Sequence, residues 1–227
     1  MNGQELEQQV KEILNKNGWQ VLSGAFYTDP STQKPREKDI IATKPQNVYQ
    51  YNVTLFIECK LIEKQTTIYF KGTISEINNT LIAYNIPYAK ISEIECRQKT
   101  HFYKKYDELF DSAKDSENVL YKAINQNLQS YQAYRKNNWQ CRVDYLIVVY
   151  SGEIFCLNQV GGTEKRENAL LKVDTIDDTF DLPNKGCLIE IVSISQFENL
   201  LKDIQEDINT LNGSMNFYRR RNNNQSD

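Results

Sequence analysis

The stretch NVTLFIECK, residues 52–60, ends an apolar run with a glutamate and a lysine. Its apolar residues suit the interior of a protein, whereas glutamate and lysine are seldom fully buried unless they are paired or bound to a ligand. Side chains two apart on a strand point to the same side, so Glu58 and Lys60 project together, about 7 Å apart. We therefore expect a buried strand that ends in two charged side chains on one face.

The residues before this strand predict the first elements of an α/β fold. Apolar residues recur at helical spacing through residues 4–17, and Asn17-Gly18 supplies a stop, so an amphipathic helix is expected there. Strands are expected at 19–27 and 36–42, separated by a loop that contains two prolines. The expected order is helix, strand, strand, strand.

The rest of the chain predicts a single large domain with an insertion. Residues 61–118 are polar and rich in tyrosine, and we interpret them as an insertion after the third strand. Helical periodicity resumes at 118–137, and further strands and a last helix follow. The sequence thus predicts one domain over residues 1–212 and a disordered tail over 213–227.

Composition limits the class of protein. The chain has 227 residues, of which 40% are hydrophobic and 25% charged, so it can bury a real core. No apolar run approaches the roughly 20 residues that cross a bilayer, and no signal pattern opens the chain, so a cytoplasmic location without membrane contact is expected. The net charge of −3 and the pI near 5.4 restrict any nucleic-acid contact to a local patch.

The cysteine and histidine content narrows the chemistry. The five cysteines form no C-x-x-C pair, which argues against a zinc site and against a disulfide framework. Two-histidine metal sites need more than the single His101, and a Ser-His-Asp triad would depend on it alone. The chain also has no glycine-rich nucleotide-binding pattern. Carboxylate-metal chemistry is the main enzymatic option that remains.

A carboxylate on the preceding strand, Asp39, is expected to face Glu58 across the sheet. Two carboxylates this close repel each other unless a cation lies between them, and Mg²⁺ takes oxygen ligands of this kind. The backbone carbonyl of Cys59 offers a further oxygen. Glu7, on the inner face of the first helix, offers a third carboxylate.

Each of these assignments has a structural alternative. The Glu-x-Lys pair would also serve as an ion pair on a solvated sheet face, and Asp39 would also cap a turn. A solvated helix face would explain Glu7 together with its neighbours Glu5 and Glu12. Glu37, on the same strand as Asp39, is a further candidate ligand or an ordinary surface charge.

The succession LEQQVKEILNKNGWQV (6–21), REKDIIA (36–42) and LFIECK (55–60) resembles the PD-(D/E)xK nuclease superfamily, especially its Mrr-like and restriction-endonuclease-like branch. The resemblance implies an αβββαβ core, in which helices flank a mixed central sheet. It further implies a deoxyribonuclease that uses Mg²⁺ or Mn²⁺ to hydrolyse DNA phosphodiesters. The residues that it implies for catalysis are Glu7, Asp39, Glu58 and Lys60, and those for the metal are Glu7, Asp39, Glu58 and the Cys59 carbonyl.

Two positions depart from the pattern of this family. Lys38 stands where the family has a proline before Asp39. The Gln-x-x-x-Tyr motif of the RecB-like branch is matched in spacing only by Asn127 and Tyr131, so no glutamine is assigned a role.

The usual biological settings that the resemblance implies for such a nuclease are restriction, phage defence or repair. The alternatives are a non-catalytic nucleic-acid or partner-binding module and a Holliday-junction-type resolvase.

A local positive strip is the candidate DNA-binding surface. RQKTHFYKKY, residues 97–106, has four basic and three aromatic residues and no acid. Such a strip can bind a phosphate backbone despite a negative net charge, although a solvated amphipathic helix explains it equally well. The residues expected to contact DNA are Arg97, Lys99, Lys104 and Lys105. A homodimer or a targeting partner protein is also compatible with the sequence.

Overall fold

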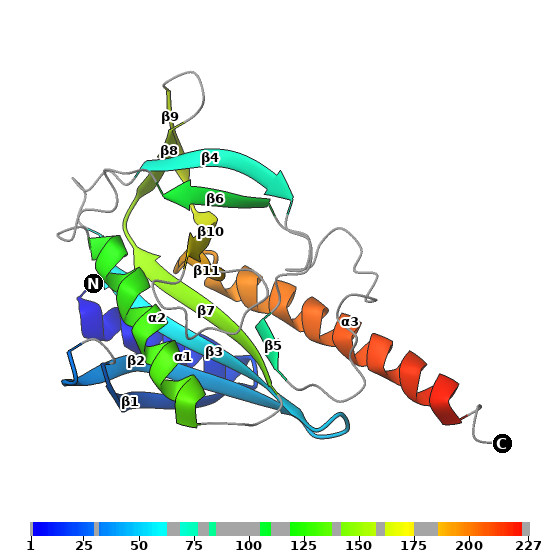
Figure 1. Cartoon of the computed structure of the whole chain (residues 1–227). Helices are drawn as coiled ribbons and strands as arrows, with labels where there is room; N and C mark the ends of the chain where they lie inside the picture. Colours follow the sequence, from blue (N-terminus) through cyan, green and yellow to red (C-terminus); the bar gives the residue numbers. More distant parts are fainter. Residues whose placement is uncertain are drawn as a thin grey trace.

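The computed structural model of the chain is an α/β fold in which helices cover both faces of a mixed sheet (Figure 1). The structure describes residues 2–29, 32–62, 69–76, 82–84, 105–109, 119–137, 142–157, 162–174 and 186–223. The strand order runs β1 (Gln20–Thr28), β2 (Pro35–Gln46), β3 (Tyr51–Leu61), β7 (Arg142–Ser151), β11 (Gly186–Ser193), β10 (Asn168–Asp174), β6 (Lys105–Leu109), β4 (Tyr69–Glu76), β8 (Ile154–Leu157) and β9 (Thr163–Arg166), and β5 (Ile82–Tyr84) is added against β7.

The first third of the chain has the predicted order of one helix and three strands. These elements are α1 (Gly3–Lys16), β1 (Gln20–Thr28), β2 (Pro35–Gln46) and β3 (Tyr51–Leu61). The helix begins at Asn2, whose side chain accepts from the Glu5 amide at 2.9 Å, while the Glu5 carboxylate accepts from the Asn2 amide at 2.8 Å. This capping box satisfies two amides that a helix start leaves unpaired. The three strands form an antiparallel meander.

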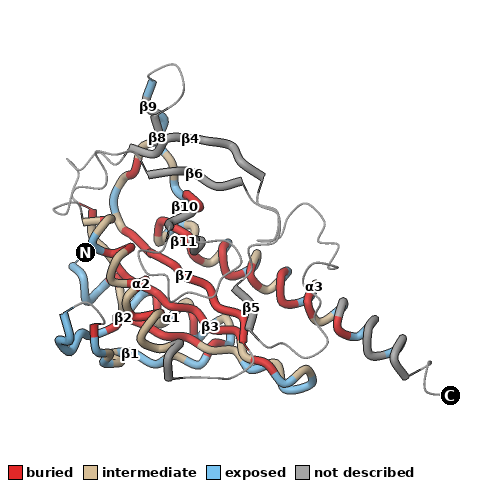
Figure 2. The backbone as a smooth tube through the Cα atoms, in the orientation of Figure 1, coloured by how far each residue is buried: buried red, intermediate tan, exposed pale blue. Residues whose placement is uncertain are grey.

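The centre of the sheet is built from strands that are far apart in the sequence. After α2 (Val119–Asn137), β7 (Arg142–Ser151) pairs in parallel with β3, and β11 (Gly186–Ser193) pairs in parallel with β7. β10 (Asn168–Asp174) follows antiparallel to β11. Buried residues fill β3 and β7, as expected for strands that are covered on both faces (Figure 2).

Strands from the predicted insertion extend this sheet. β4 (Tyr69–Glu76), β5 (Ile82–Tyr84) and β6 (Lys105–Leu109) all come from the segment between β3 and α2. β5 pairs with the first residues of β7, ahead of the part of β7 that pairs with β11. β4 pairs with β6 and with β8 (Ile154–Leu157), which in turn pairs with β9 (Thr163–Arg166).

Two apolar clusters hold the helices to the sheet. α1 packs on one face through Leu6, Val10 and Leu14, in a cluster that also contains buried residues of α3 (Phe197–Asn223). α2 packs on the opposite face, in a cluster with Phe56 of β3. The Phe56 ring lies edge-on to the Tyr131 ring, with their centroids 5.2 Å apart.

The last helix corrects the expected disordered tail, because α3 continues to Asn223 and so includes residues 213–223. Leu211 and Met215 lie one turn apart and belong to the cluster on the α1 face, with exposed fractions of 0% and 2%. Burial of this stripe stabilises a helix whose polar composition suggested disorder. Residues 224–227 of the expected tail lie outside the described residues.

Within the residues that the structure describes, none of the helices combines the length and the apolarity that a membrane span requires.

Candidate functional site

The charged residues that end β3 meet β2, α1 and α2 at one end of the meander. Lys38 Nζ lies 2.7 Å from Glu58 Oε1, and the two side chains are 1% and 2% exposed. Burial raises the pKa of Glu58 and lowers that of Lys38, and the attraction between the two groups opposes both changes. A buried charge is tolerated when an opposite charge and hydrogen bonds compensate it, as they do here.

Asn127 of α2 fixes this ion pair to the sheet. Its Oδ1 accepts from Lys38 Nζ at 3.2 Å, while its Nδ2 donates to the carbonyl oxygens of Phe56 and Ile147 at 3.1 and 2.9 Å. Asn127 is fully buried. One amide therefore links α2 to the backbones of β3 and β7 and orients the Lys38 ammonium at the same time.

Lys60 approaches the other oxygen of the same carboxylate. Its Nζ lies 3.5 Å from Glu58 Oε2, and its side chain is 24% exposed. Glu58 and Lys60 thus share one side of β3, as the strand pattern predicts. Each oxygen of Glu58 faces an ammonium group, a buried one at Oε1 and a partly exposed one at Oε2.

Asp39 binds the backbone of β3. Its Oδ2 accepts a hydrogen bond from the Cys59 amide at 2.7 Å. The ladder between β2 and β3 extends only to the pair of Ile40 with Ile57, so the Asp39 side chain binds an amide just past the end of the ladder. Asp39 was expected to face Glu58 across the sheet. Its charge raises the pKa of Glu58, but the β2 side chain that bonds Glu58 is that of Lys38.

A change of face within β2 explains this difference. Ile40 packs in the α1 cluster, yet Lys38, two residues earlier, bonds Glu58 and Asn127 on the α2 side. Regular alternation would put both residues on one face. Gly24 of β1 lies across from this change of face, between the pairs Ser23–Ile40 and Ala25–Lys38. The φ of Gly24 is +65°, a conformation that glycine adopts readily.

Glu7 lies on the other side of Asp39, and its side chain is 32% exposed. Burial raises its pKa, the Asp39 carboxylate raises it further, and Lys11 opposes both effects from 3.7 Å. The structure therefore brings Glu7 within electrostatic reach of Asp39. The alternatives Glu5 and Glu12 instead bond within their own helix, to Asn2 and Gln8.

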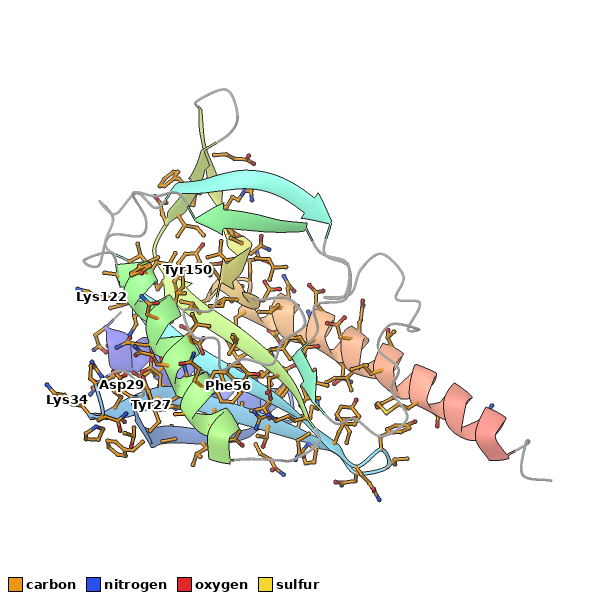
Figure 3. The ribbon with its side chains drawn as sticks, in the orientation of Figure 1. Tyr27, Asp29, Lys34, Phe56, Lys122 and Tyr150 are labelled. Carbon is orange, nitrogen blue, oxygen red and sulfur yellow. The ribbon has the colours of Figure 1, made fainter. Side chains whose placement is uncertain are left out.

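Side chains from β1 and the following loop border the site. The Tyr27 hydroxyl donates to the Gln126 carbonyl at 3.4 Å, and Asp29, which is 1% exposed, accepts from Arg36 Nε at 3.3 Å. Tyr27 and Asp29 lie close together beside α2, and Lys34 extends outward (Figure 3). Burial, then the charges of Glu58 and Asp29, raise the pKa of Tyr27 to about 12.

The carboxylate oxygens of the site are of the chemical kind that binds a hard divalent cation, but their arrangement does not form a metal site. Among the described residues, no three histidine, cysteine or acidic side chains are arranged so that they could hold a metal ion. On the Glu58 side, two lysines occupy the carboxylate. On the Asp39 side, one oxygen is engaged by an amide and Glu7 is close, so carboxylate oxygens of the kind that Mg²⁺ prefers are available there.

The predicted DNA strip falls largely outside the structure. Arg97, Lys99 and Lys104 lie outside the described residues, and Lys105 is described only as the first backbone position of β6. Its role in DNA contact stays a prediction. The sequence analysis also missed two buried residues of the site, Lys38 and Asn127. The signals that point to them are a lysine two residues before the apolar run IIA (40–42) and the Asn127–Tyr131 spacing on an amphipathic helix.

No family model matches this chain, and no curated protein or solved structure matches it closely enough to count as related.

Proposed function

We propose that the chain is a metal-dependent endonuclease with a restriction-endonuclease-like core, which hydrolyses phosphodiester bonds in DNA. One observation carries the proposal: the Asp39 carboxylate binds the Cys59 amide next to Glu58, and its charge raises the pKa of Glu58. Lys60 lies against Glu58, and Glu7 is within reach of Asp39. A binding surface has no evident need for this combination.

The order of the elements supports the same proposal. A helix, three antiparallel strands, a second helix and a strand parallel to the third follow one another, with the insertion after β3. This is the order that the family resemblance implies. A DNA substrate would also agree with the expected cytoplasmic location.

In this proposal, different residues of the chain would bind the metal ion and stabilise the charge that develops on the phosphate. Asp39, Glu7 and the Cys59 carbonyl would hold a Mg²⁺ or Mn²⁺ ion. Such an ion, when bound, polarises a phosphate and lowers the pKa of a bound water. Lys60, partly exposed beside Glu58, would donate to the attacking water or to the phosphate oxygens, where negative charge grows in the transition state.

A second candidate is a non-catalytic nucleic-acid or partner-binding module with the same fold. It is favoured by the state of Glu58, which is 2% exposed and has a lysine at each oxygen. An ion pair of this kind can be purely structural. The two candidates differ in whether the chain cleaves DNA at all.

A nicking assay on supercoiled plasmid separates them. The proposal predicts nicking with Mg²⁺ or Mn²⁺ and none with EDTA. The Asp39→Asn variant should lose nicking, while Glu37→Gln, a matched change at an exposed acid two residues earlier, should keep it. A folded wild-type protein that leaves duplex and single-stranded DNA intact with either metal would favour the binding module.

A further inference from the structure

We propose that Arg36 binds a backbone phosphate of the DNA substrate, and that the buried carboxylate of Asp29 positions its guanidinium for this contact. The proposal rests on the proposed function, because it names a contact with the same substrate. Arg36 begins the exposed end of β2, two residues before Lys38.

Arg36 lies on the α2 side of the sheet, the side on which Glu58 and Lys60 lie. It pairs across the ladder with Tyr27, and paired side chains share one side of a sheet. The Tyr27 hydroxyl reaches the Gln126 carbonyl of α2, and Tyr27 and Asp29 lie together beside this helix (Figure 3). DNA that reaches Lys60 would therefore pass on the side where Arg36 lies.

Asp29 is a fixed group, which makes it a suitable anchor. Its side chain is 1% exposed, and its two oxygens accept from different donors, Oδ2 from Arg36 Nε and Oδ1 from the Thr32 amide, each at 3.3 Å. Its backbone is held as well, because its amide donates to the Lys34 carbonyl at 2.9 Å and its carbonyl accepts from the Gln33 amide at 2.8 Å. The loop between β1 and β2 thus places the carboxylate before any ligand arrives.

The bond through Nε leaves the terminal nitrogens of the guanidinium pointing away from Asp29. The Arg36 side chain is 45% exposed, so a ligand in solution can reach these nitrogens. A planar guanidinium matches the oxygens of a phosphate with two parallel donors. An arginine that is ordered in advance also loses less side-chain freedom when it binds.

The charge on this side of the sheet favours an anion. Arg36, Lys38 and Lys60 face the carboxylates of Asp29 and Glu58, which gives these five side chains a net formal charge of +1. Both carboxylates are buried, whereas Arg36 and Lys60 are partly exposed, so the cations are the groups that a ligand meets. A phosphate backbone is the polyanion that the proposed function supplies.

The test measures the affinity of the full chain for a fluorescently labelled DNA duplex across a salt series in EDTA, so that nothing is cut. Arg36→Gln should weaken binding about five- to tenfold near 0.1 M salt and reduce the salt slope by about 0.9, the value for one lost phosphate contact. Lys16→Gln is the matched control. It makes the same change in net charge at an exposed lysine that also pairs with a carboxylate, that of Glu198 at 3.2 Å, and should leave the slope unchanged.

Asp29→Asn tests the positioning role through the direction of its effect. The substitution removes a negative charge, so charge alone predicts tighter binding of DNA. It should instead weaken binding at least about threefold, because asparagine has one side-chain acceptor where Asp29 serves two donors. In the Arg36→Gln background, Asp29→Asn should cause no further loss, since the group that it positions is gone. Circular dichroism checks that each variant is folded.

Three results would overturn the inference: an unchanged salt slope in a folded Arg36→Gln protein, tighter binding by Asp29→Asn, or a wild-type protein that does not bind the duplex. Plasmid nicking with Mg²⁺ or Mn²⁺ is measured separately on the same proteins. Binding that depends on Arg36, without nicking, would remove the nuclease and leave the phosphate contact intact. Nicking by wild type, with an unchanged slope in Arg36→Gln, would do the reverse.

Discussion

Asp39 and Cys59 meet where two neighbouring strands part, with the Asp39 carboxylate accepting from the Cys59 amide at 2.7 Å. The ladder between β2 and β3 extends to the pair of Ile40 with Ile57, so past this pair a side chain of β2, not its backbone, accepts the hydrogen bond from β3. Any test of Asp39 in catalysis therefore also changes a hydrogen bond of the fold.

We expect Asp39→Ala to lower the free energy of unfolding by about 1.5–3 kcal/mol, the range for a hydrogen bond to a charged group. Asp39→Asn should cost less, because its side-chain carbonyl still accepts from the Cys59 amide. Urea unfolding of both variants measures the difference. Glu37→Ala is the control, an exposed change on the same strand that should stay within about 0.5 kcal/mol. An Asp39→Ala protein as stable as Glu37→Ala would show that the hydrogen bond contributes nothing.

The pair of Lys38 with Glu58 predicts strong coupling between two substitutions. Lys38→Met alone leaves a buried carboxylate with only the partly exposed Lys60, and Glu58→Leu alone leaves a buried ammonium. Each should cost about 3–5 kcal/mol, whereas the double variant should recover much of this, because apolar side chains can replace a buried ion pair. A double-mutant cycle in urea measures the coupling. Strictly additive losses would mean that the pair is not a unit.

Much of the fold was predictable because it follows local periodicity. The apolar residues Leu6, Val10 and Leu14 of α1 are all buried, as their spacing predicts, and the run in β3 lies at the centre of the sheet. The tail was mispredicted because composition outweighed the stripe that continues to Met215. The pairing of β5 with β7 brings together residues about sixty apart, which no local pattern indicates.

The site was predictable only in part, for a physical reason. That Glu58 and Lys60 share one side follows from strand geometry. That Lys38 reaches Glu58 depends on a change of face within β2, which lies opposite a glycine on another strand. The role of Asn127 depends on where α2 crosses β3 and β7. Both are tertiary effects.

Gly24 provides a direct test of this change of face. Its φ of +65° suits glycine, and a Cβ there would lie 3.0 Å from the Glu37 carboxylate, an exposed group that can move. Gly24→Ala should therefore cost about 1–2 kcal/mol from backbone strain alone. Gly24→Asn should cost less, because asparagine tolerates this conformation better. Thermal unfolding compares the two, with Ser23→Ala as the control. Equal stability of all three variants would contradict a strained position.

The raised pKa of Tyr27 predicts a pH dependence of stability. An unfolded tyrosine ionises near pH 10, and the fold raises the pKa of Tyr27 to about 12. Between these values the folded chain holds a proton that the unfolded chain has lost, so the free energy of unfolding falls as the pH rises. Tyr27→Phe should lose less stability than wild type from pH 10 to 12. Absorbance at 295 nm should show one late-ionising tyrosine fewer. Parallel stability curves for the two proteins would contradict the shift.

Lys60 offers the cleanest separation of activity from stability. Its ammonium is partly exposed and 3.5 Å from Glu58, so Lys60→Ala should cost no more than about 1 kcal/mol of stability. If Lys60 stabilises charge at the phosphate, the same variant should nick plasmid on the order of a hundredfold more slowly. Lys60→Arg should not restore the rate, because a planar guanidinium presents its donors differently from a compact ammonium. Lys34→Ala, at an exposed lysine, is the control and should cut normally. Single-turnover nicking by a folded Lys60→Ala protein at the wild-type rate would remove Lys60 from the proposed mechanism.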